Sequence, residues 1–281
     1  MSLTSSLIRR SILVCLGASL ASLALACTVT VKTQNKYVPP SGVSKTALTA
    51  WTGQAIVVEN ANGTTTVVGD ATATTVSVSA TPFAFADNEA DGTAAINDEV
   101  ATIKLDESSG RFSVSCGQAS ASHGTAGVGT TGCDLKVTIP AGSAASGVVL
   151  SVHSHNGGVS VSNVYAADAP NQLTILTDNG EADATGINGG AKVRTENGGA
   201  TASVAPRKGS VVEVSSGNGD VTLSLPSDFA ADALRIKGKK VTVTGFGDLS
   251  GTSTSRGAAG TGAASVTASC DNLGDVTVKP Q

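Results

Sequence analysis

The sequence predicts an all-β protein, a parallel β-solenoid or β-helix-like stack of units of about 20 residues that each contain an Asn-Gly turn. Asn-Gly pairs recur at the same place within segments that alternate apolar and polar residues. Aromatic residues make up only 3% of the 281 residues, and charged residues only 14%. Stacked strands lie about 4.8 Å apart and enclose a narrow core, so small aliphatic side chains suit this fold better than aromatic ones.

Each unit is predicted to be a strand, a tight turn and a second strand. A Val or Ile stands four residues before the turn Asn, and a Ser, Thr or Asn stands two before it, which is the period-two alternation of a strand. Asn-Gly readily adopts the positive φ angles of a tight turn. In the four consecutive units from Asn156 to Asn218 the Asn residues are 23, 18 and 21 positions apart. The predicted turn residues are Asn62, Gly63, Asn156, Gly157, Asn179, Gly180, Asn197, Gly198, Asn218 and Gly219.

An antiparallel meander is the alternative fold, because Asn-Gly between alternating segments is also the strongest short signal for a hairpin. The solenoid is preferred because the units align with one another along the chain. They also place alanines at core positions (Ala182, Ala184, Ala200 and Ala202). A degenerate unit around Asn272 closes the chain and puts Cys270 at the position of a small inward-facing residue.

The N-terminus is predicted to be an export signal. Arg9 and Arg10 precede an uncharged apolar segment, residues 11–26, that ends directly before Cys27. The small Ala26 before a Cys at this place resembles a bacterial lipobox, so Cys27 is expected to receive a lipid and to become the first residue of the mature chain. Cleavage after Ala26 by an ordinary signal peptidase and retention as an uncleaved anchor are the alternatives. Retention is the weaker one, because a span needs about 20 residues.

The expected domains are a signal peptide over residues 1–26, a lipid-anchored flexible tether over 27–48 and a β-strand repeat domain over 49–281 with an inserted loop at 83–134. Several acyl chains would anchor the protein stably in a membrane, whereas one would bind only marginally. Thr28 stands where an Asp would resemble an inner-membrane retention signal. The expected location is therefore the cell envelope, lipid-anchored, at a bacterial outer membrane.

Cysteine usage agrees with export. Cys116 follows one strand-like segment and Cys133 precedes another, with a loop of Gly, Ser, Thr and Ala between them. A disulfide that closes this loop in an oxidising compartment would stabilise the fold by about 3 kcal/mol. Three free buried thiols, with Cys270 as the third, are the alternative.

The segments that flank the Asn-Gly units resemble a known family. Residues 135–142 (LKVTIPAG) and 219–233 (GDVTLSLPSDFAADA), with the turn units between them, are similar to the bacterial putative adhesin family of repeated β-strands, whose function is unknown. The similarity extends over roughly residues 54–278. It implies the repeated β architecture and an adhesin-like role, and it implies no catalytic residue.

One acidic segment imitates a calcium-binding loop. Asp87, Glu89 and Asp91 supply oxygens at alternate positions, a glycine follows, and Asp98 stands where the last ligand would be. The bidentate Glu of such a loop is missing. A short acidic helix or a solvated loop is therefore the preferred interpretation, with calcium as the alternative.

Two further groups of residues are candidate sites. His153 and His155 alternate on one strand face and could hold a metal ion, but no acid stands in the same unit, so they are interpreted as exposed residues. Asp178, Glu181 and Asp183 could suggest a glycosidase pair or a polysaccharide lyase. Each stands beside an Asn-Gly turn, so polar turn residues are the preferred interpretation.

The remaining chemistry excludes several functions. The net charge of −4 excludes a simple nucleic-acid interface, because phosphate contacts need clustered Lys and Arg. The sequence has no motif for an activated nucleophile or a zinc hydrolase, and no cofactor is expected. We expect a non-catalytic binding, adhesin-like or structural module held at the membrane through Cys27, with an unknown protein or glycan as ligand. A solenoid enzyme acting on polysaccharide and a self-assembling envelope scaffold are the alternatives.

Overall fold

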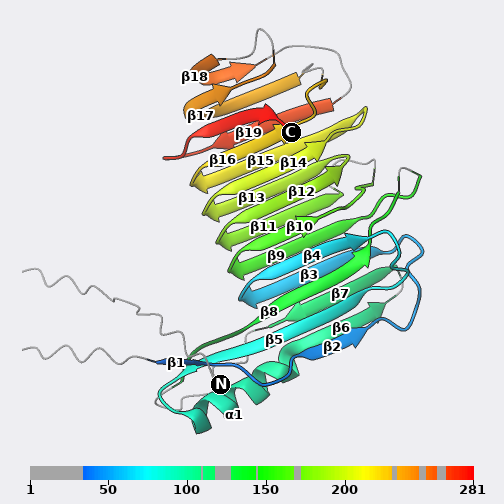
Figure 1. The fold of residues 1–281 in the computed structure, drawn as a ribbon, viewed down its shortest axis with the longest axis vertical. Helices are drawn as coiled ribbons and strands as arrows, with labels where there is room; N and C mark the ends of the chain where they lie inside the picture. Colours follow the sequence, from blue (N-terminus) through cyan, green and yellow to red (C-terminus); the bar gives the residue numbers. More distant parts are fainter. Residues whose placement is uncertain are drawn as a thin grey trace, which may run out of the picture.

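The computed structural model describes residues 34–281 except 109, 118–127, 144, 168–171, 230–232, 247–250 and 258–263. Within these ranges the chain forms strands β1–β20 and one helix, α1, and most strand pairs are parallel (Figure 1). The expected all-β, mostly parallel architecture is therefore confirmed. Among the described residues no helix is both long enough and apolar enough to cross a membrane.

Two parallel stacks of strands form the body of the protein (Figure 1). In spatial order the first stack consists of β7 (Arg111–Cys116), β3 (Ala55–Asn62), β9 (Leu150–Asn156), β11 (Leu173–Asn179), β13 (Ala191–Asn197), β15 (Ser210–Asn218) and β19 (Ala264–Cys270). The second consists of β8 (Val128–Pro140), β4 (Thr65–Asp70), β10 (Val159–Ser162), β12 (Ala182–Asn188), β14 (Ala200–Ala205), β16 (Val221–Leu225) and β20 (Val276–Pro280). We call a strand of the first stack and the strand of the second stack that follows it in the chain a rung.

The order of the rungs in space differs from their order in the chain. The β7/β8 rung comes after β3/β4 in sequence but lies on the far side of it, away from β9/β10. At the other end β19/β20 lies between β15/β16 and strand β17 (Ala233–Val243), although β17 precedes β19 in the chain. Both ends of the stack are therefore closed by segments that fold back.

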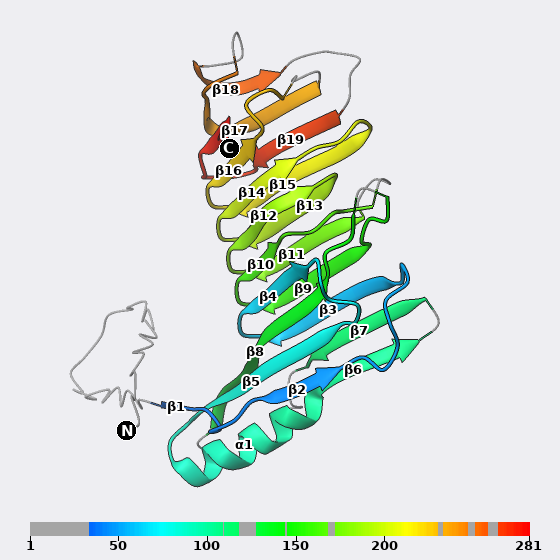
Figure 2. The same ribbon diagram turned by 45° about the vertical axis from the view of Figure 1, so that its right-hand side comes forward.

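The end near the N-terminus is covered by antiparallel strands and the helix (Figure 2). β5 (Ser77–Ala86) pairs with β8, and β6 (Ile103–Ser108) pairs with β7. β1 (Asn35–Tyr37) and β2 (Val43–Thr46) pair with β5, and α1 (Glu89–Thr102) packs Ala95 and Ile96 against Ala84 of β5. Covering the last parallel strands removes an edge that could pair with another chain.

At the opposite end β17 crosses both stacks. Its first half pairs in parallel with β19, its second half pairs in parallel with β20, and its outer side pairs with the antiparallel β18 (Gly251–Gly257). The single strand β17 thus covers the outer edges of both β19 and β20.

The core lies between the two stacks. Inward and outward residues alternate along nearly every strand, and the buried set consists mostly of Val, Ile, Leu and Ala (residues 56, 58, 152, 161, 175, 184, 193, 202, 214 and 223 are examples). Buried aromatic side chains in the described chain are confined to the N-terminal end, where Phe83 and Phe112 lie. The scarcity of aromatic residues in the sequence thus agrees with a narrow core enclosed between two stacks of strands.

Two expected segments differ from the structure. Residues 35–37 and 43–46, expected within a flexible tether, form β1 and β2, and Glu107 of β6 accepts hydrogen bonds from the amides of Leu48 and Thr49 at 2.5 and 3.1 Å. The segment 83–134, expected to be an inserted loop, contributes α1, β6 and β7 in full, together with parts of β5 and β8. The short helix and the strand-like segments beside Cys116 and Cys133 were visible in the sequence, but their place at the edge of the parallel strands was not.

Candidate functional site

The turns line up along one edge of the stack and are joined by asparagine side chains. In each of five steps the side-chain Nδ2 of one Asn donates to the side-chain Oδ1 of the Asn one rung away, at 3.0 to 3.1 Å. The first member, Asn62, also donates to the carbonyl of Thr131 at 3.0 Å. We call this series the asparagine ladder; its members are Asn62, Asn156, Asn179, Asn197, Asn218 and Asn272.

Five of the six ladder residues are followed by a glycine, Asn272 being followed by Leu273, and close packing requires those glycines. Gly198 has φ of 150°, and a Cβ at this position would lie 2.0 Å from the carbonyl oxygen of Gly180 in the neighbouring rung. Gly219 meets Gly198 in the same way at 2.1 Å. The turns can therefore stack only where this residue has no side chain.

A second series of hydrogen bonds lies just inside the turns. The hydroxyls of Thr177, Thr195 and Ser216 donate to carbonyls of turn glycines in the preceding rung at 2.9, 2.8 and 2.7 Å. Cys270 pairs in register with Ser216 and is a free, buried thiol that accepts a hydrogen bond from the amide of Gly274. This placement agrees with a small inward-facing residue.

Cys116 and Cys133, which are 17 positions apart in the sequence, are joined by a disulfide. Cys116 pairs in register with Asn60, two residues before the turn of the neighbouring rung. The disulfide thus links β7 to β8 where five of the other six rungs have a tight Asn-Gly turn. The carboxylate of the buried Glu99 approaches Cys116 Sγ to 3.4 Å.

The structure brings both candidate histidines together with an acid from the next rung. Asp178 Oδ1 lies 3.2 Å from His153 Nε2, and Asp178 Oδ2 lies 2.8 Å from His155 Nδ1. The two imidazole rings are 4.4 Å apart between centroids. Hydrogen bonds from His155 and then His153 lower the pKa of Asp178 below its usual range. Side-chain donors of all three residues lie within 4.8 Å of one another, which is close enough for one metal ion. We call these three residues the His-Asp cluster.

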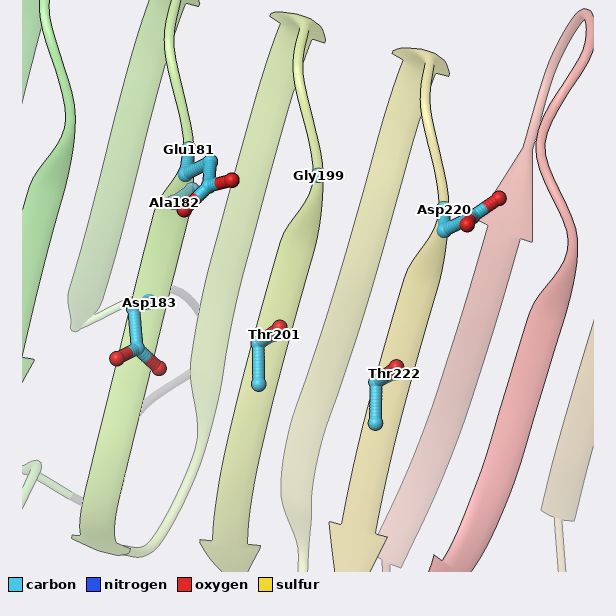
Figure 3. Close-up of a pocket in the computed structure, with 7 residues that line it drawn as sticks. All are labelled: Glu181, Ala182, Asp183, Gly199, Thr201, Asp220 and Thr222. Atoms are coloured by element: carbon cyan, nitrogen blue, oxygen red, sulfur yellow. The ribbon is translucent and has the colours of Figure 1, made fainter.

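On the second stack a shallow hollow of about 230 Å³ lies across β12, β14 and β16 (Figure 3). Gly199 stands in the row between Glu181 and Asp220, and its missing side chain opens the space. Asp183, Thr201 and Thr222 form the next row across the same three strands (Figure 3). Three carboxylates therefore surround the hollow, which favours polar or cationic groups over anions.

Asp183 is the most perturbed acid of this hollow. Burial raises its pKa, the charge of Glu181 raises it further, and a hydrogen bond from the amide of Ala184 opposes the shift. Its Oδ1 is buried without a hydrogen-bond partner among the described residues. The carboxylate of Asp183 is thus partly desolvated, which disfavours its ionised form.

The three acids that suggested a glycosidase lie on two different stacks. Asp178 belongs to the His-Asp cluster on the first stack, whereas Glu181 and Asp183 line the hollow on the second. The sequence did not reveal this division, because all three stand within six residues around one turn. Pairing Asp178 with the histidines required the register between β9 and β11.

The acidic segment forms helix α1 in place of a calcium-binding loop. Asp87 precedes the helix, Asn88 caps it by accepting a hydrogen bond from the Asp91 amide, and Glu89, Asp91 and Asp98 lie within it. Acids in the first turn stabilise a helix N-terminus. Cys27 lies outside the described residues.

Comparisons with known proteins give structural neighbours only. No family model matches the chain, and no curated protein matches it. One similar solved structure is a putative cell adhesion protein from Clostridium sporogenes ATCC 15579, with 9% identity, a TM-score of 0.40, and coverage of 86% of this chain and 100% of that one. Putative adhesins from Bacteroides fragilis NCTC 9343 (9%, TM-score 0.27, 86% and 98%) and Parabacteroides merdae ATCC 43184 (10%, 0.20, 86% and 97%) are also similar. At these identities the likeness assigns neither a ligand nor an activity to this chain.

Proposed function

We propose that this chain is a lipid-anchored protein of the bacterial cell envelope whose folded body, a β-solenoid of Asn-Gly-turn units of about 20 residues, acts as a non-catalytic, adhesin-like binding module. The anchor is the lipidated Cys27. The ligand is a glycan or a protein with a polar surface, bound along the outward face of the second stack.

The observation that carries this proposal is a row of short polar side chains across that face. Neighbouring strands in register place their outward residues in one line (Thr66, Ser160, Asp183, Thr201, Thr222 and Thr277). Because parallel strands lie about 4.8 Å apart, hydroxyls and carboxylates repeat at that spacing. Such a row suits an extended ligand with regularly spaced polar groups. The hollow at Gly199 is a recess in this face where one group of the ligand could bind.

The nature of the surface limits the ligand. In the described part of the chain only four large apolar side chains are exposed: Val38, Leu48, Tyr165 and Leu273. A surface without a sizeable apolar patch does not favour an apolar partner. Recognition would therefore depend on hydrogen bonds.

The placement of the chain supports a role at a distance from the anchor. The described chain begins at the end that carries α1, and the rungs extend from there toward β17 and β18 (Figure 1). A lipid on Cys27 would hold the α1 end near the membrane and leave the outward faces accessible. The covered ends of the stack also favour a separate binding module over a scaffold that grows by end-to-end pairing.

Binding can be tested by filling the hollow. Gly199→Leu places a side chain between Glu181 and Asp220, and a Cβ there meets nothing closer than 3.5 Å, so the fold should tolerate it. Gly158→Leu is the matched control, since Gly158 occupies the same position in the turn two rungs away and does not line the hollow. The intact protein would be applied to an array of bacterial and host glycans and to isolated envelope fractions. We expect saturable binding that falls at least about tenfold in Gly199→Leu and persists in Gly158→Leu.

The same material tests the enzymatic alternative. An enzyme would release new reducing ends or unsaturated sugars from a bound polysaccharide, and Asp183→Asn would abolish this release. That result would contradict a non-catalytic binding module. Binding without product would retain the proposal.

The anchor is tested separately. Cys27→Ala should release the protein from membranes, and continued fractionation with membranes would indicate an uncleaved apolar anchor instead. Digestion by protease on intact cells, compared with cells whose outer envelope has been opened, would then decide between a surface adhesin and an internal envelope protein.

A further inference from the structure

We infer that His153, His155 and Asp178 form a binding site for a divalent transition-metal ion of the zinc class. The site lies on the outward face of the first stack, whereas the hollow lies on the second, and the inference does not depend on the proposed function.

The donor geometry fits such an ion. Zinc binds imidazole nitrogen at about 2.0–2.1 Å and carboxylate oxygen at about 2.0–2.2 Å, so the ligand atoms of a tetrahedral site lie roughly 3.4 Å apart. The two measured N···O distances, 3.2 Å for His153 and 2.8 Å for His155, are close to this value. Small rotations of the side chains would centre an ion between the three donors.

The donor types select the class of metal. Two neutral imidazoles and one carboxylate suit Zn²⁺, Cu²⁺, Ni²⁺ and Co²⁺, whereas Ca²⁺ and Mg²⁺ prefer sites made of oxygen alone. Three protein ligands leave one position of a tetrahedron open. The side chains of His153, His155 and Asp178 are 33%, 57% and 39% exposed, so water can reach that position.

The backbone already holds the donors in place. His153 and His155 are two residues apart on β9 and therefore project from the same face of the strand. Asp178 stands between Thr177, which pairs with Ser154, and Asn179, which pairs with Asn156, and this register puts it beside His155. Both strands have parallel neighbours on each side, and the ladder bond from Asn179 to Asn156 fixes their relative position one residue away. Binding thus needs little ordering of the chain.

Two more acids flank the cluster. Glu59 of β3 pairs in register with His153, and Glu196 of β13 stands beside Asp178 in the register between β11 and β13. Their charges favour a cation at the cluster. A sequence scan misses the whole arrangement because its members come from four rungs.

A purely structural role is the competing explanation. In that case the histidines only donate hydrogen bonds to Asp178, and the cluster has no affinity for metal. Both explanations predict that substitutions change stability to some extent, so metal binding itself must be measured.

The test uses the purified full chain, without a polyhistidine tag. Titration calorimetry with Zn²⁺ should give one saturable site, and Co²⁺ should give the visible absorption of a four-coordinate complex. His155→Ala and Asp178→Asn should each weaken Zn²⁺ binding at least about tenfold. Ca²⁺ should not compete at millimolar concentration.

Two control variants separate this site from unrelated binding. His123→Ala removes the one other histidine of the chain, and Asp183→Asn removes an acid of the hollow. Both should bind Zn²⁺ like the unaltered protein, and circular dichroism should show every variant folded. No saturable Zn²⁺ binding, unchanged affinity in folded Asp178→Asn, or loss of binding in His123→Ala would each overturn the inference.

Discussion

Asn179 donates a hydrogen bond from its side-chain Nδ2 to the side-chain Oδ1 of Asn156 in the neighbouring rung, at 3.1 Å. Each interior member of the asparagine ladder therefore both donates to one neighbour and accepts from the other. The ladder joins turns that are 18 to 94 residues apart in sequence, and it holds the strands in the register on which both candidate sites depend.

The ladder should contribute unequally along its length. Asn197→Ala removes three side-chain hydrogen bonds, those to Asn179 Oδ1 and to the Asp178 carbonyl and the one from Asn218, whereas Asn272→Ala removes the bond to Asn218. At about 1 kcal/mol per hydrogen bond, we expect losses in unfolding free energy of about 3 and about 1 kcal/mol. Urea denaturation measures both. Equal losses would show that the ladder geometry does not determine stability.

The disulfide should stabilise the fold because it restricts the unfolded chain. With a sequence separation of 17 between the cysteines, Cys116→Ser combined with Cys133→Ser should lower the unfolding free energy by about 3 kcal/mol. Cys270→Ser is the control, since serine already occupies the paired position at Ser216, and it should cost less than about 1 kcal/mol. A double variant as stable as the original chain would mean that the link adds nothing to the β7/β8 rung.

A large side chain should destabilise the protein where a residue of β14 faces the core, and should have little effect where the residue faces outward. Ala200 is fully buried, and its neighbour Thr201 faces outward. Ala200→Phe should destabilise the protein by about 1–3 kcal/mol, and Thr201→Phe should change stability by less than about 0.5 kcal/mol. Thermal unfolding of the pair gives the answer, and similar melting temperatures would contradict the inward and outward assignment on β14.

Asp183 should make stability depend on pH. Burial holds the pKa of its folded form above the unfolded value of about 3.9, so the ionised carboxylate opposes folding at neutral pH. This penalty is fully present above the folded pKa and disappears as pH falls below the unfolded value. Asp183→Asn should therefore raise the melting temperature at pH 7, and its advantage should vanish near pH 3.

A neighbouring substitution checks the cause. Because the charge of Glu181 adds to the raised pKa of Asp183, Glu181→Gln should give a smaller gain at pH 7 with the same direction of pH dependence. An advantage of Asp183→Asn that stays constant from pH 3 to pH 7 would exclude the titration of Asp183 as its source.

Much of the architecture could be predicted from local patterns. Alternation on both sides of each Asn-Gly pair indicated strand, turn, strand, and the alignment of the units favoured parallel stacking over hairpins. The small core residues followed from the same alternation, as Ala182, Ala184, Ala200 and Ala202 are all buried. These features are local because each depends on the residues of one unit.

Other features depended on which units become neighbours. The segment 83–134 was expected to be an insertion containing a short acidic helix and strand-like parts, but the edge that its helix and strands cover exists only once the parallel strands have stacked. His153 and His155 lacked an acid in their own unit, and the register between β9 and β11 supplies Asp178. Asp178 and Asp183 looked like members of one acidic group, and the turn between them sends them to different stacks.

The sequence by itself therefore determined the strand and turn pattern, the small residues of the core and the positions of the turns, because the alternation of apolar and polar side chains acts over a few residues. Only the tertiary structure decided the order of the rungs, the coverage of both ends and the composition of the His-Asp cluster. These depend on hydrogen bonds between strands far apart in the chain, and many pairings of similar units are compatible with the same local pattern until the whole stack forms.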